Sequence, residues 1–390
     1  MAKETNAKKI KKTFSLKEVV FLILTTCVVS LTMGYALANR KDVKEKYDKY
    51  VQLFVDNYNY ILNHYYNDLD KEALINGAID GMVDSLKDEY SEYIDNSNYF
   101  DTVLNGSYQG IGIQVVTTTD NRNIIYSVIE DSPAAVSGIQ KYDEIISIDG
   151  KTFQDSTSLA KYVRDSKSGM FKMKVLRKDE QLEIDLNRSL VVIKSIESKL
   201  IEEDNKKIGY IKVGVFATNT AEQFQDAILD LEEKNIDSLI IDVRDNTGGH
   251  LTTVVRMLSS LLDSSKVIYQ MDIKGKITKY YSQGKQTKEY PIVILQNSSS
   301  ASASELFSAT MKEQYGATIV GSTSYGKGTV QELVKLSNGK EYKLTTKKWL
   351  TSDGIWINEK GVKPDIEVIN DEQSNTDEQL EKAIEILKQD

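Results

Sequence analysis

The chain has 390 residues, of which 40% are hydrophobic. This composition is typical of globular proteins. The chain is too long for a single hydrophobic core, so two or three domains are expected. The net charge of -9 argues against a nucleic-acid-binding protein. Cys27 is the only cysteine and there are only two histidines, which excludes an intrachain disulfide and cysteine-based metal clusters. We expect no metal and no cofactor.

The N-terminal part carries an apolar segment. Residues 1–18 are rich in lysine, and residues 19–38 then run without a charge. As a helix this segment would be about 30 Å long, enough to cross a bilayer, and its basic flank would stay in the cytoplasm. Ala36-Leu-Ala38 also fits a signal-peptide cleavage site, so a retained anchor, which we favour, competes with a removed signal peptide. Either one places the remaining chain on the extracytoplasmic side.

Residues 41–100 show apolar side chains at helical spacing and many tyrosines, which predicts a helical arm or a homodimer contact. The apolar positions are Val51, Phe54, Val55, Tyr58, Ile61 and Leu62, followed by Leu74, Ile75, Ala78, Ile79, Met82, Val83 and Leu86. Acidic residues are as common as lysines here, which disfavours nucleic-acid stacking. His64 falls in this region, where a partly buried structural role is expected.

Residues 101–188 resemble a PDZ domain, first through Gly110-Ile-Gly-Ile113, which is similar to that fold's carboxylate-binding loop. The resemblance implies that the amides of Ile111, Gly112 and Ile113 hold the terminal carboxylate of a peptide. It also implies that the segment from Ile111 to Val116 is an edge strand to which that peptide adds as a further strand. Glycine in the loop permits the close approach.

Three further segments support this resemblance. Residues 132–139 and 143–150 are similar to the rest of the PDZ signature, and residues 158–167 would form the groove helix. Leu159 and Val163 are the candidate lining of the peptide pocket. Tyr142 stands where the fold usually has glycine, so the turn at this position departs from the family pattern.

From Lys207 onward the pattern alternates between strands and helices. Strands are expected at 208–215 and 238–243, and helices at 221–234 and 251–262. Gly248 and Gly249 therefore precede a helix, where main-chain amides are good donors to an oxyanion. A plain tight turn is the alternative for these two glycines.

Ser302 is expected at a junction between a strand at 291–296 and a helix at 303–315. A hydroxyl there gains from the helix dipole, and the amide of Ala303 could donate to an oxyanion. Ser302 and Glu305 also fit a capping box, so an ordinary helix cap remains an alternative.

A serine nucleophile needs a base, and two residues compete for this role. His250 follows the glycine pair and leaves a histidine-dependent hydrolase open. Lys327 lies between two glycines near apolar residues, and a lysine can act as a base if burial lowers its pKa. Residues 321–327 match G-x-x-x-x-G-K, but Gly328 replaces the required Ser or Thr and a strand pattern follows, which argues against nucleotide binding.

Two segments together resemble the active site of the C-terminal processing peptidases, or tail-specific proteases. They are Ser-Ala-Ser-Ala-Ser-Glu305 and Tyr325-Gly-Lys-Gly-Thr-Val-Gln331, whose Ser302 and Lys327 are 25 residues apart, as in that family. The resemblance implies that Ser302 is the nucleophile, Lys327 the base and Gln331 the residue that orients the lysine. Four residues of extended strand span about 13 Å, so the segment between Lys327 and Gln331 must bend.

The family pattern extends from about residue 46 to residue 368. Residues 78–93 are similar to its helical segment and residues 344–365 to its closing strands. Thr247 replaces the family's proline, and His250 replaces an apolar residue. An apolar stripe in residues 371–390 predicts a C-terminal helix that docks or dimerises.

The expected fold class is therefore a multidomain α+β protein. It would contain an N-terminal membrane helix (19–38), a helical arm (41–100) and a PDZ domain (101–188). That domain precedes an α/β, crotonase-like (ββα) serine protease core (189–370) and a C-terminal helix (371–390).

The expected function is that of a membrane-anchored bacterial endopeptidase that binds protein C-termini and cleaves with a Ser/Lys dyad. Its expected partners are protein or peptide substrates with free C-termini, the membrane and a second copy of the chain. An inactive peptide-binding protein of the same fold remains the alternative, beside the His250-dependent hydrolase.

Overall fold

The computed structural model describes residues 15, 17, 19–20, 25–26, 30, 48–94, 103–285, 289–336, 341–370 and 376–389. The chain divides into two compact units, residues 1–79 and residues 80–390. Most of the expected membrane segment, 19–38, lies outside the described residues. Within the described part, none of the helices combines the length and the apolar character needed to span a membrane.

The first unit contains helix α2 (Lys49–His64) and the start of helix α3 (Lys71–Asp84), as the apolar spacing predicts. No residue of α2 is buried. His64 is exposed, contrary to the expected partial burial. It lies 2.9 Å from the Tyr60 carbonyl oxygen and stacks on the Tyr60 ring, so its contacts are with its own helix. The expected homodimer contact stays a prediction.

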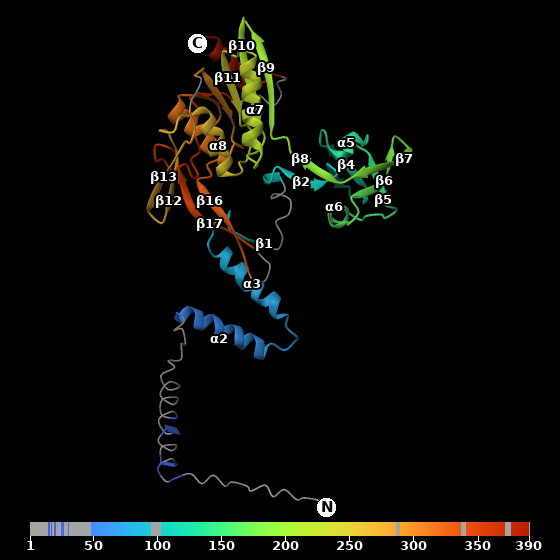
Figure 1. The fold of residues 1–390 in the computed structure, drawn as a ribbon, viewed down its shortest axis with the longest axis vertical. Coiled ribbons are helices and arrows are strands. Elements are labelled where there is room, and N and C mark those ends of the chain that lie inside the picture. Colours follow the sequence, from blue (N-terminus) through green and yellow to red (C-terminus); the bar gives the residue numbers. More distant parts are fainter. Residues whose placement is uncertain are drawn as a thin grey trace, which may run out of the picture. The chain divides into compact units, whose positions relative to one another are not determined.

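The PDZ region contains a five-stranded antiparallel sheet and two helices (Figure 1). The strands are β3 (Ile113–Thr117), β4 (Asn123–Val128), β5 (Glu144–Ile148), β6 (Met170–Arg177) and β7 (Glu180–Asn187), and the helices are α5 (Pro133–Val136) and α6 (Ser156–Asp165). Strand β3 forms one edge of this sheet, as expected for a peptide-binding strand. Strands β2 (Ser107–Gly110) and β8 (Ser189–Val192), on either side of the domain in sequence, pair with each other.

A six-stranded sheet forms the centre of the protease core. Its spatial order is β18 (Ile366–Glu367), β15 (Thr318–Gly321), β14 (Ile292–Gln296), β11 (Ser238–Asp242), β10 (Lys206–Val213) and β9 (Ile196–Glu203). All neighbouring pairs are parallel except β9 with β10. Every residue of β11 and β14 is buried, because helices cover both faces of the sheet.

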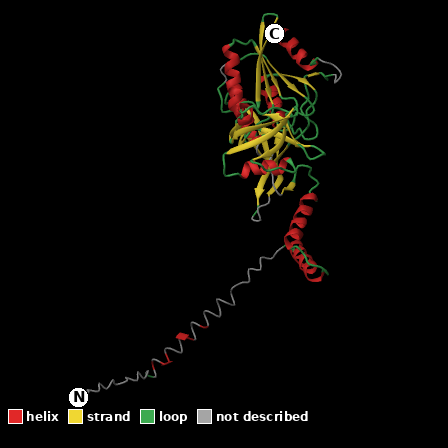
Figure 2. Ribbon diagram, turned by 90° about the vertical axis from the view of Figure 1, so that its right-hand side faces the viewer, coloured by secondary structure: helices red, strands yellow, loops and turns green. Residues whose placement is uncertain are grey.

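Different helices cover the two faces, as Figure 2 shows. Helices α7 (Thr220–Glu233), α8 (Leu251–Leu261) and α9 (Ala303–Thr310) share one apolar cluster with alternate residues of β10 and β11. Helix α10 (Glu378–Gln389) packs Ala383 and Leu387 against the opposite face, with Ile208, Ile240 and Val293. The apolar stripe of the C-terminal helix therefore docks on the core of its own chain.

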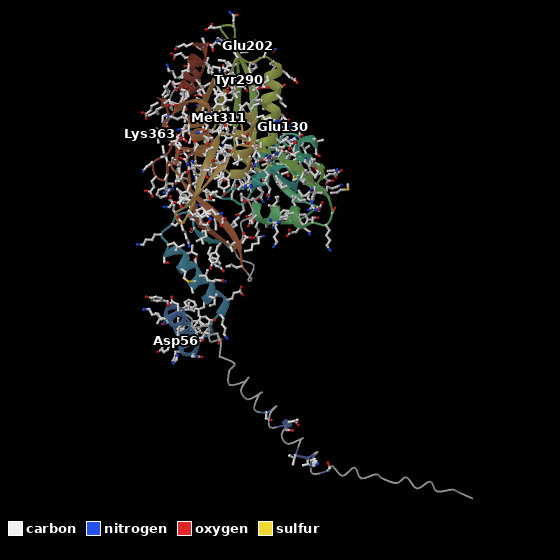
Figure 3. The ribbon with its side chains drawn as sticks, turned by 60° about the vertical axis from the view of Figure 1, so that its left-hand side comes forward. Asp56, Glu130, Glu202, Tyr290, Met311 and Lys363 are labelled. Atoms are coloured by element: carbon white, nitrogen blue, oxygen red, sulfur yellow. The ribbon has the colours of Figure 1, made fainter. Side chains whose placement is uncertain are left out.

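The expected helix at 303–315 is divided into α9 and a π-helix, η1 (Met311–Tyr315). Met311 is fully buried at the start of η1, among the core side chains drawn in Figure 3. The change from α-helix to π-helix therefore lies in the buried core.

A second sheet lies beside the site described below. It has the order β1 (Glu92–Ile94), β17 (Glu341–Leu350), β12 (Val267–Ile273) and β13 (Lys276–Tyr281), and β16 (Thr329–Lys335) also pairs with β17. The prediction of closing strands at residues 344–365 was only partly right. Residues 351–365 form turns and loops, and the only later strand in the described part is β18.

Candidate active site

Ser302 lies on a strained turn between β14 and α9. Its backbone has φ 54° and ψ -110°, a conformation that is unfavourable for any residue with a Cβ atom. Strain of this kind is concentrated at functional sites, and a sharp strand-to-helix turn is how many hydrolases expose a nucleophilic serine. A helix cap alone does not require this backbone conformation, because ordinary cap residues are extended.

The neighbouring serines have structural roles. Ser300 Oγ donates to the Val243 carbonyl at 2.8 Å, and Ser304 Oγ donates to the Asn246 carbonyl at 2.7 Å. Both side chains are fully buried, whereas Ser302 is partly exposed. Of the three serines in this run, Ser302 is thus the one that a substrate could reach.

Glu305 lies beneath the turn and accepts hydrogen bonds from two separate segments. Its Oε2 accepts from the amides of Ser302 (2.7 Å) and Lys327 (2.8 Å). Its Oε1 accepts from Ser324 Oγ and the Gly326 amide, both at 2.6 Å. The expected link between Ser302 and Glu305 is therefore present, but the carboxylate also binds the segment that carries the lysine.

The glycine loop that precedes α8 packs directly against Ser302. A Cβ added to Gly248 would lie 3.0 Å from Ser302 Cβ and 3.1 Å from the Ala303 nitrogen. The Gly248 amide donates to Asn246 Oδ1 at 2.9 Å, so it is already paired. Gly249 forms a bridge with Phe216 through the Gly248 carbonyl and the His250 amide, which does not use the Gly249 amide.

Asn246 was not identified from the sequence, although it connects three parts of the site. Its side-chain nitrogen donates to the Val213 carbonyl at 2.8 Å, and its carbonyl accepts from the Ala301 amide at 3.1 Å. Because Asn246 is buried, these bonds hold the glycine loop against the turn at Ser302. Its position two residues before Gly248 was the available signal.

Two tryptophans of a later segment of the chain hold the main chain around Lys327 in place. Trp349 Nε1 donates to the Lys327 carbonyl at 2.9 Å, and Trp356 Nε1 donates to the Gly328 carbonyl at 3.0 Å. A Cβ on Gly328 would lie 2.8 Å from that indole nitrogen, and Gly326 has φ 95°. Both flanking glycines are therefore required by the local geometry.

The amine of Lys327 lies in partly buried, aromatic surroundings. Its Nζ is 4.3 Å from the centre of the Tyr90 ring, in the segment that precedes the PDZ domain. Burial lowers the pKa of Lys327, and repulsion from Lys343 lowers it further, while Asp88, Glu89 and Glu305 act in the opposite direction. The net effect on the pKa is downward, as a lysine base requires.

Gln331 lies at a bulge in β16. Lys327 precedes β16, and a bulge at Val330 and Gln331 interrupts the pairing with β17, so the two residues do not lie on one straight strand. Gln331 Nε2 donates to the hydroxyls of Thr329 and Thr345, each at 3.0 Å. The Thr345 amide in turn donates to Ser91 Oγ, which bonds Asp88.

His250 has a different environment from that of a catalytic base. It is the residue before α8, and its amide donates to the Phe216 carbonyl at 2.8 Å. Its Nε2 atom is buried and has no hydrogen-bond partner in the described part of the chain, so it does not bond Ser302. No three His, Cys, Asp or Glu side chains among the described residues are grouped to hold a metal ion.

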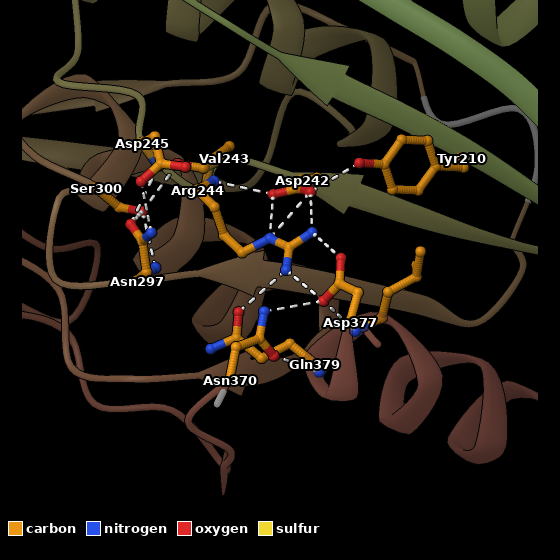
Figure 4. Close-up of polar contacts among 11 residues, drawn as sticks. Tyr210, Asp242, Val243, Arg244, Asp245, Asn297, Ser300, Asn370, Asp377 and Gln379 are labelled. Carbon is orange, nitrogen blue, oxygen red and sulfur yellow. Dashed lines mark hydrogen bonds and ion pairs between the residues drawn. The ribbon is translucent and has the colours of Figure 1, made fainter. Parts of the chain in front are cut away.

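Arg244, at the start of the glycine loop, anchors the C-terminal helix (Figure 4). Its guanidinium bonds Asp242 at 2.6 Å and both carboxylate oxygens of Asp377 at 2.7 and 2.8 Å. Burial would raise the pKa of Asp377, but the guanidinium and neighbouring donors lower it to about 2. The next residue, Asp245, bonds Asn297, so this network reaches the segment before Ser302.

The loop at Gly112 is packed closely against the start of α5. Gly112 has φ 83°, and a Cβ there would lie 2.1 Å from Ser132 Cβ. Ser132 caps α5, and the Ala134 amide donates to the Ile111 carbonyl at 2.9 Å. The loop from Gly110 to Ile113 is thus packed against the start of α5, and Ile113 opens the edge strand β3.

Tyr142 adopts φ 74°, the conformation that glycine favours. The turn of the PDZ fold is therefore kept despite the side chain. The groove helix α6 is present, and its residues Leu159 and Val163 are buried in the PDZ core.

Comparisons with known proteins agree with this architecture. Residues 207–368 match peptidase family S41, residues 109–187 match the PDZ domain, and residues 30–98 match the N-terminal domain of the activating protease CtpB. The chain is 35% identical to the carboxy-terminal processing protease CtpB of Bacillus subtilis (strain 168) over 328 residues, which cover 82% of this chain and 68% of the relative.

A second relative is the carboxy-terminal processing protease CtpA of the same strain, with 33% identity over 363 residues, 89% of this chain and 76% of the relative. Among solved structures, the photosystem II D1 C-terminal processing protease has a TM-score of 0.52 and 21% identity, with 83% of this chain and 88% of that chain covered. At this level of identity, the structural likeness concerns the fold alone.

Proposed function

Because the chain belongs to peptidase family S41, the carboxy-terminal processing serine proteases with a PDZ domain, we propose that Ser302 is its nucleophile and Lys327 its general base. One observation carries this proposal. The amide nitrogens of Ser302 and Lys327 bond the same oxygen of Glu305 at 2.7 Å and 2.8 Å, so they are at most 5.5 Å apart (2.7 Å plus 2.8 Å). The nucleophile and the base are therefore carried by adjacent main-chain segments.

The reaction proceeds through an acyl-enzyme. Neutral Lys327 Nζ accepts the proton of Ser302 Oγ while that oxygen attacks the peptide carbonyl. The resulting ammonium donates the proton to the leaving amine, and the C-N bond breaks. Lys327, neutral again, then takes a proton from water, whose oxygen attacks the ester carbonyl. As the bond from that carbon to Ser302 Oγ breaks, the Lys327 ammonium returns the proton to Ser302 Oγ and the acid product leaves.

The oxyanion of the tetrahedral intermediate needs donors near Ser302. We assign the amides of Ala303 and Gly249 to this role, because Ala303 begins α9 and the bridge to Phe216 leaves the Gly249 amide unused. Gly248 contributes by its close approach, since its own amide bonds Asn246. We assign to Gln331 the role of orienting the lysine, from a side chain held by the hydroxyls of Thr329 and Thr345 on the strands that follow Lys327.

The PDZ domain selects substrates by a free C-terminus. The amides from Ile111 to Ile113 receive the carboxylate, and the tail adds to the edge strand β3. A substrate with an amidated C-terminus lacks the negative charge, so it should bind and be cleaved more slowly than the matching acid. Equal cleavage of the two forms contradicts selection by this loop.

The segment 19–38 tethers the protease to the membrane, with the catalytic domain outside the cytoplasm. This follows from the uncharged run and its lysine-rich flank. Intact mass of the native protein from a washed membrane fraction tests it. A mature N-terminus beyond residue 38 would show that the segment is removed.

Three proteins test the dyad: the wild type, Ser302→Ala and Lys327→Ala, each incubated with an unfolded protein that has a free C-terminus. Both variants should lose at least about 1000-fold in kcat/KM, the scale seen when a nucleophile or its base is removed. A Ser302→Ala protein that still cleaves the substrate disproves the nucleophile. A wild type that binds the tail without cleaving it indicates a peptide-binding protein.

A further inference from the structure

The carboxylate of Glu305 has a place in the active site that exceeds a helix cap. A cap needs one acceptor for the first turn of its helix. Glu305 accepts from four donors, and only the Ser302 amide belongs to its own helix start. The other three come from Ser324, Gly326 and Lys327, in the segment that carries the proposed base.

The bonding pattern indicates the charge of this group. Burial raises the pKa of Glu305, which has no exposed surface, above its ordinary value, and the four hydrogen bonds offset only part of this rise. Three of the four partners are main-chain amides, which can only donate, and the Ser324 hydroxyl donates to Oε1 while it accepts from the Val362 amide at 2.7 Å. A protonated carboxyl would direct its own hydrogen at one of these donors, so the arrangement fits the carboxylate.

A buried negative charge at this point acts on Lys327 in two ways. It holds the main chain of Lys327 beside that of Ser302, which limits how far the two side chains can separate. It also stabilises the ammonium form of Lys327, because opposite charges in a partly buried site attract. The first effect favours the reaction. The second acts to raise the pKa of the Lys327 amine, which offsets part of the lowering by burial.

We propose that Glu305 is a positioning residue of the protease, a buried anionic clip that sets the separation of Ser302 and Lys327 and tunes the protonation of the amine. This inference rests on the proposed dyad. It assigns no contact with the substrate to Glu305, so its effect should fall on kcat and on the pH profile while KM stays nearly constant.

Glu305→Gln tests the clip with a side chain of the same size. The amide group places a donor against main-chain donors and removes the negative charge. We expect kcat to fall at least 100-fold, KM to change less than threefold, and the acid limb of the kcat/KM profile to move to lower pH. A variant with wild-type kcat, or with lower kcat and an unmoved acid limb, overturns the proposal.

Glu305→Asp separates position from charge. The shorter side chain keeps the charge but cannot reach both segments, so kcat should fall while the acid limb stays close to that of the wild type. If Glu305→Gln does not fold, this variant still decides, because wild-type kcat in Glu305→Asp would contradict the positioning role. Near-UV circular dichroism and binding of a C-terminal peptide establish that each protein is folded.

Asp365→Asn is the matched control in the same domain. Asp365 also accepts from a main-chain amide, that of Ile319 at 2.9 Å, and pairs with Lys312, but it does not bond either segment of the dyad. It should lower stability while leaving kcat within threefold and the acid limb unmoved. Failure of the dyad itself is distinguishable, since Lys327→Ala would then remain active whatever Glu305→Gln does.

Discussion

The amine of Lys327 lies 4.3 Å from the centre of the Tyr90 ring, although the two residues are separated in sequence by the whole PDZ domain. The short strand β1, which follows Tyr90, pairs with β17, and this pairing brings the segment to the lysine. Tyr90, which precedes the PDZ domain, therefore contributes to the surroundings of the candidate base. The first prediction concerns this contact.

Replacing Tyr90 by Leu should lower kcat/KM at least about tenfold and move its acid limb to higher pH. Burial is the largest cause of the lowered pKa of Lys327, so water admitted by loss of the ring should raise that pKa. The lost cation-ring attraction acts oppositely but is the smaller effect at a partly exposed site. Tyr90→Phe keeps the ring and should stay within threefold; equal loss in both variants would argue against the ring as the cause.

The pH dependence of kcat/KM should report the protonation of Lys327. The base must be neutral, so activity rises with pH through its pKa, and burial together with repulsion from Lys343 places this pKa below the ordinary lysine range. Lys343→Gln removes that repulsion and should move the acid limb to higher pH. The exposed Lys335 is the control: Lys335→Gln should leave the profile unchanged.

Two glycines with the same backbone angle separate strain from close packing in the PDZ loop. Gly112 and Gly138 both have φ 83°, but only a Cβ on Gly112 would meet another residue, Ser132 at 2.1 Å. Gly112→Ala should therefore weaken binding of a C-terminal peptide at least tenfold, as measured by fluorescence anisotropy. Gly138→Ala carries the same strain without the clash and should keep the peptide affinity; equal weakening would contradict the packing argument.

The bond from Arg244 to Asp377 should stabilise the protease core. Asp377→Asn is expected to lower the free energy of unfolding by about 1 kcal/mol, a discounted value because this carboxyl is partly exposed. Urea unfolding followed by tryptophan fluorescence reports on this domain, because both tryptophans, Trp349 and Trp356, belong to it. Lys388→Ala removes the exposed ion pairs that α10 makes with Glu203 and Asp204, and it should cost less stability than Asp377→Asn.

The same pair has a defined pH window. The folded-state pKa of Asp377 is lowered from 3.8 to about 2, so its contribution is present above pH 3.8 and disappears as the pH falls through about 2. The difference in stability between wild type and Asp377→Asn should therefore shrink between pH 4 and pH 2. A difference that persists at pH 2 would show that the charge is not its source.

The sequence predicted the alternating elements of the core because buried strands and amphipathic helices have distinct periods, as in β11, β14 and α7. It also predicted the position of Ser302, since a strand and a helix meet there. The bonds of Glu305 to Ser324, Gly326 and Lys327 could not be foreseen, because these partners reach it only through tertiary folding.

Three other features escaped the sequence for similar reasons. Tyr90 reaches Lys327 through pairing of β1 with β17, whose residues are far apart in the chain. The turns after Leu350 replace the expected strands, because this segment supplies Trp356 and Asn358 to Gly328, the residue after Lys327. His64 was expected to be partly buried from its apolar neighbours, but α2 is exposed.

The most direct measurement is a comparison of kcat/KM for wild type, Lys327→Ala and His250→Ala on one peptide with a free C-terminus. If Lys327 is the base that activates Ser302, Lys327→Ala should lose at least about 1000-fold, and His250→Ala should remain within about tenfold of the wild type. Retained activity in Lys327→Ala together with its loss in His250→Ala would contradict the account.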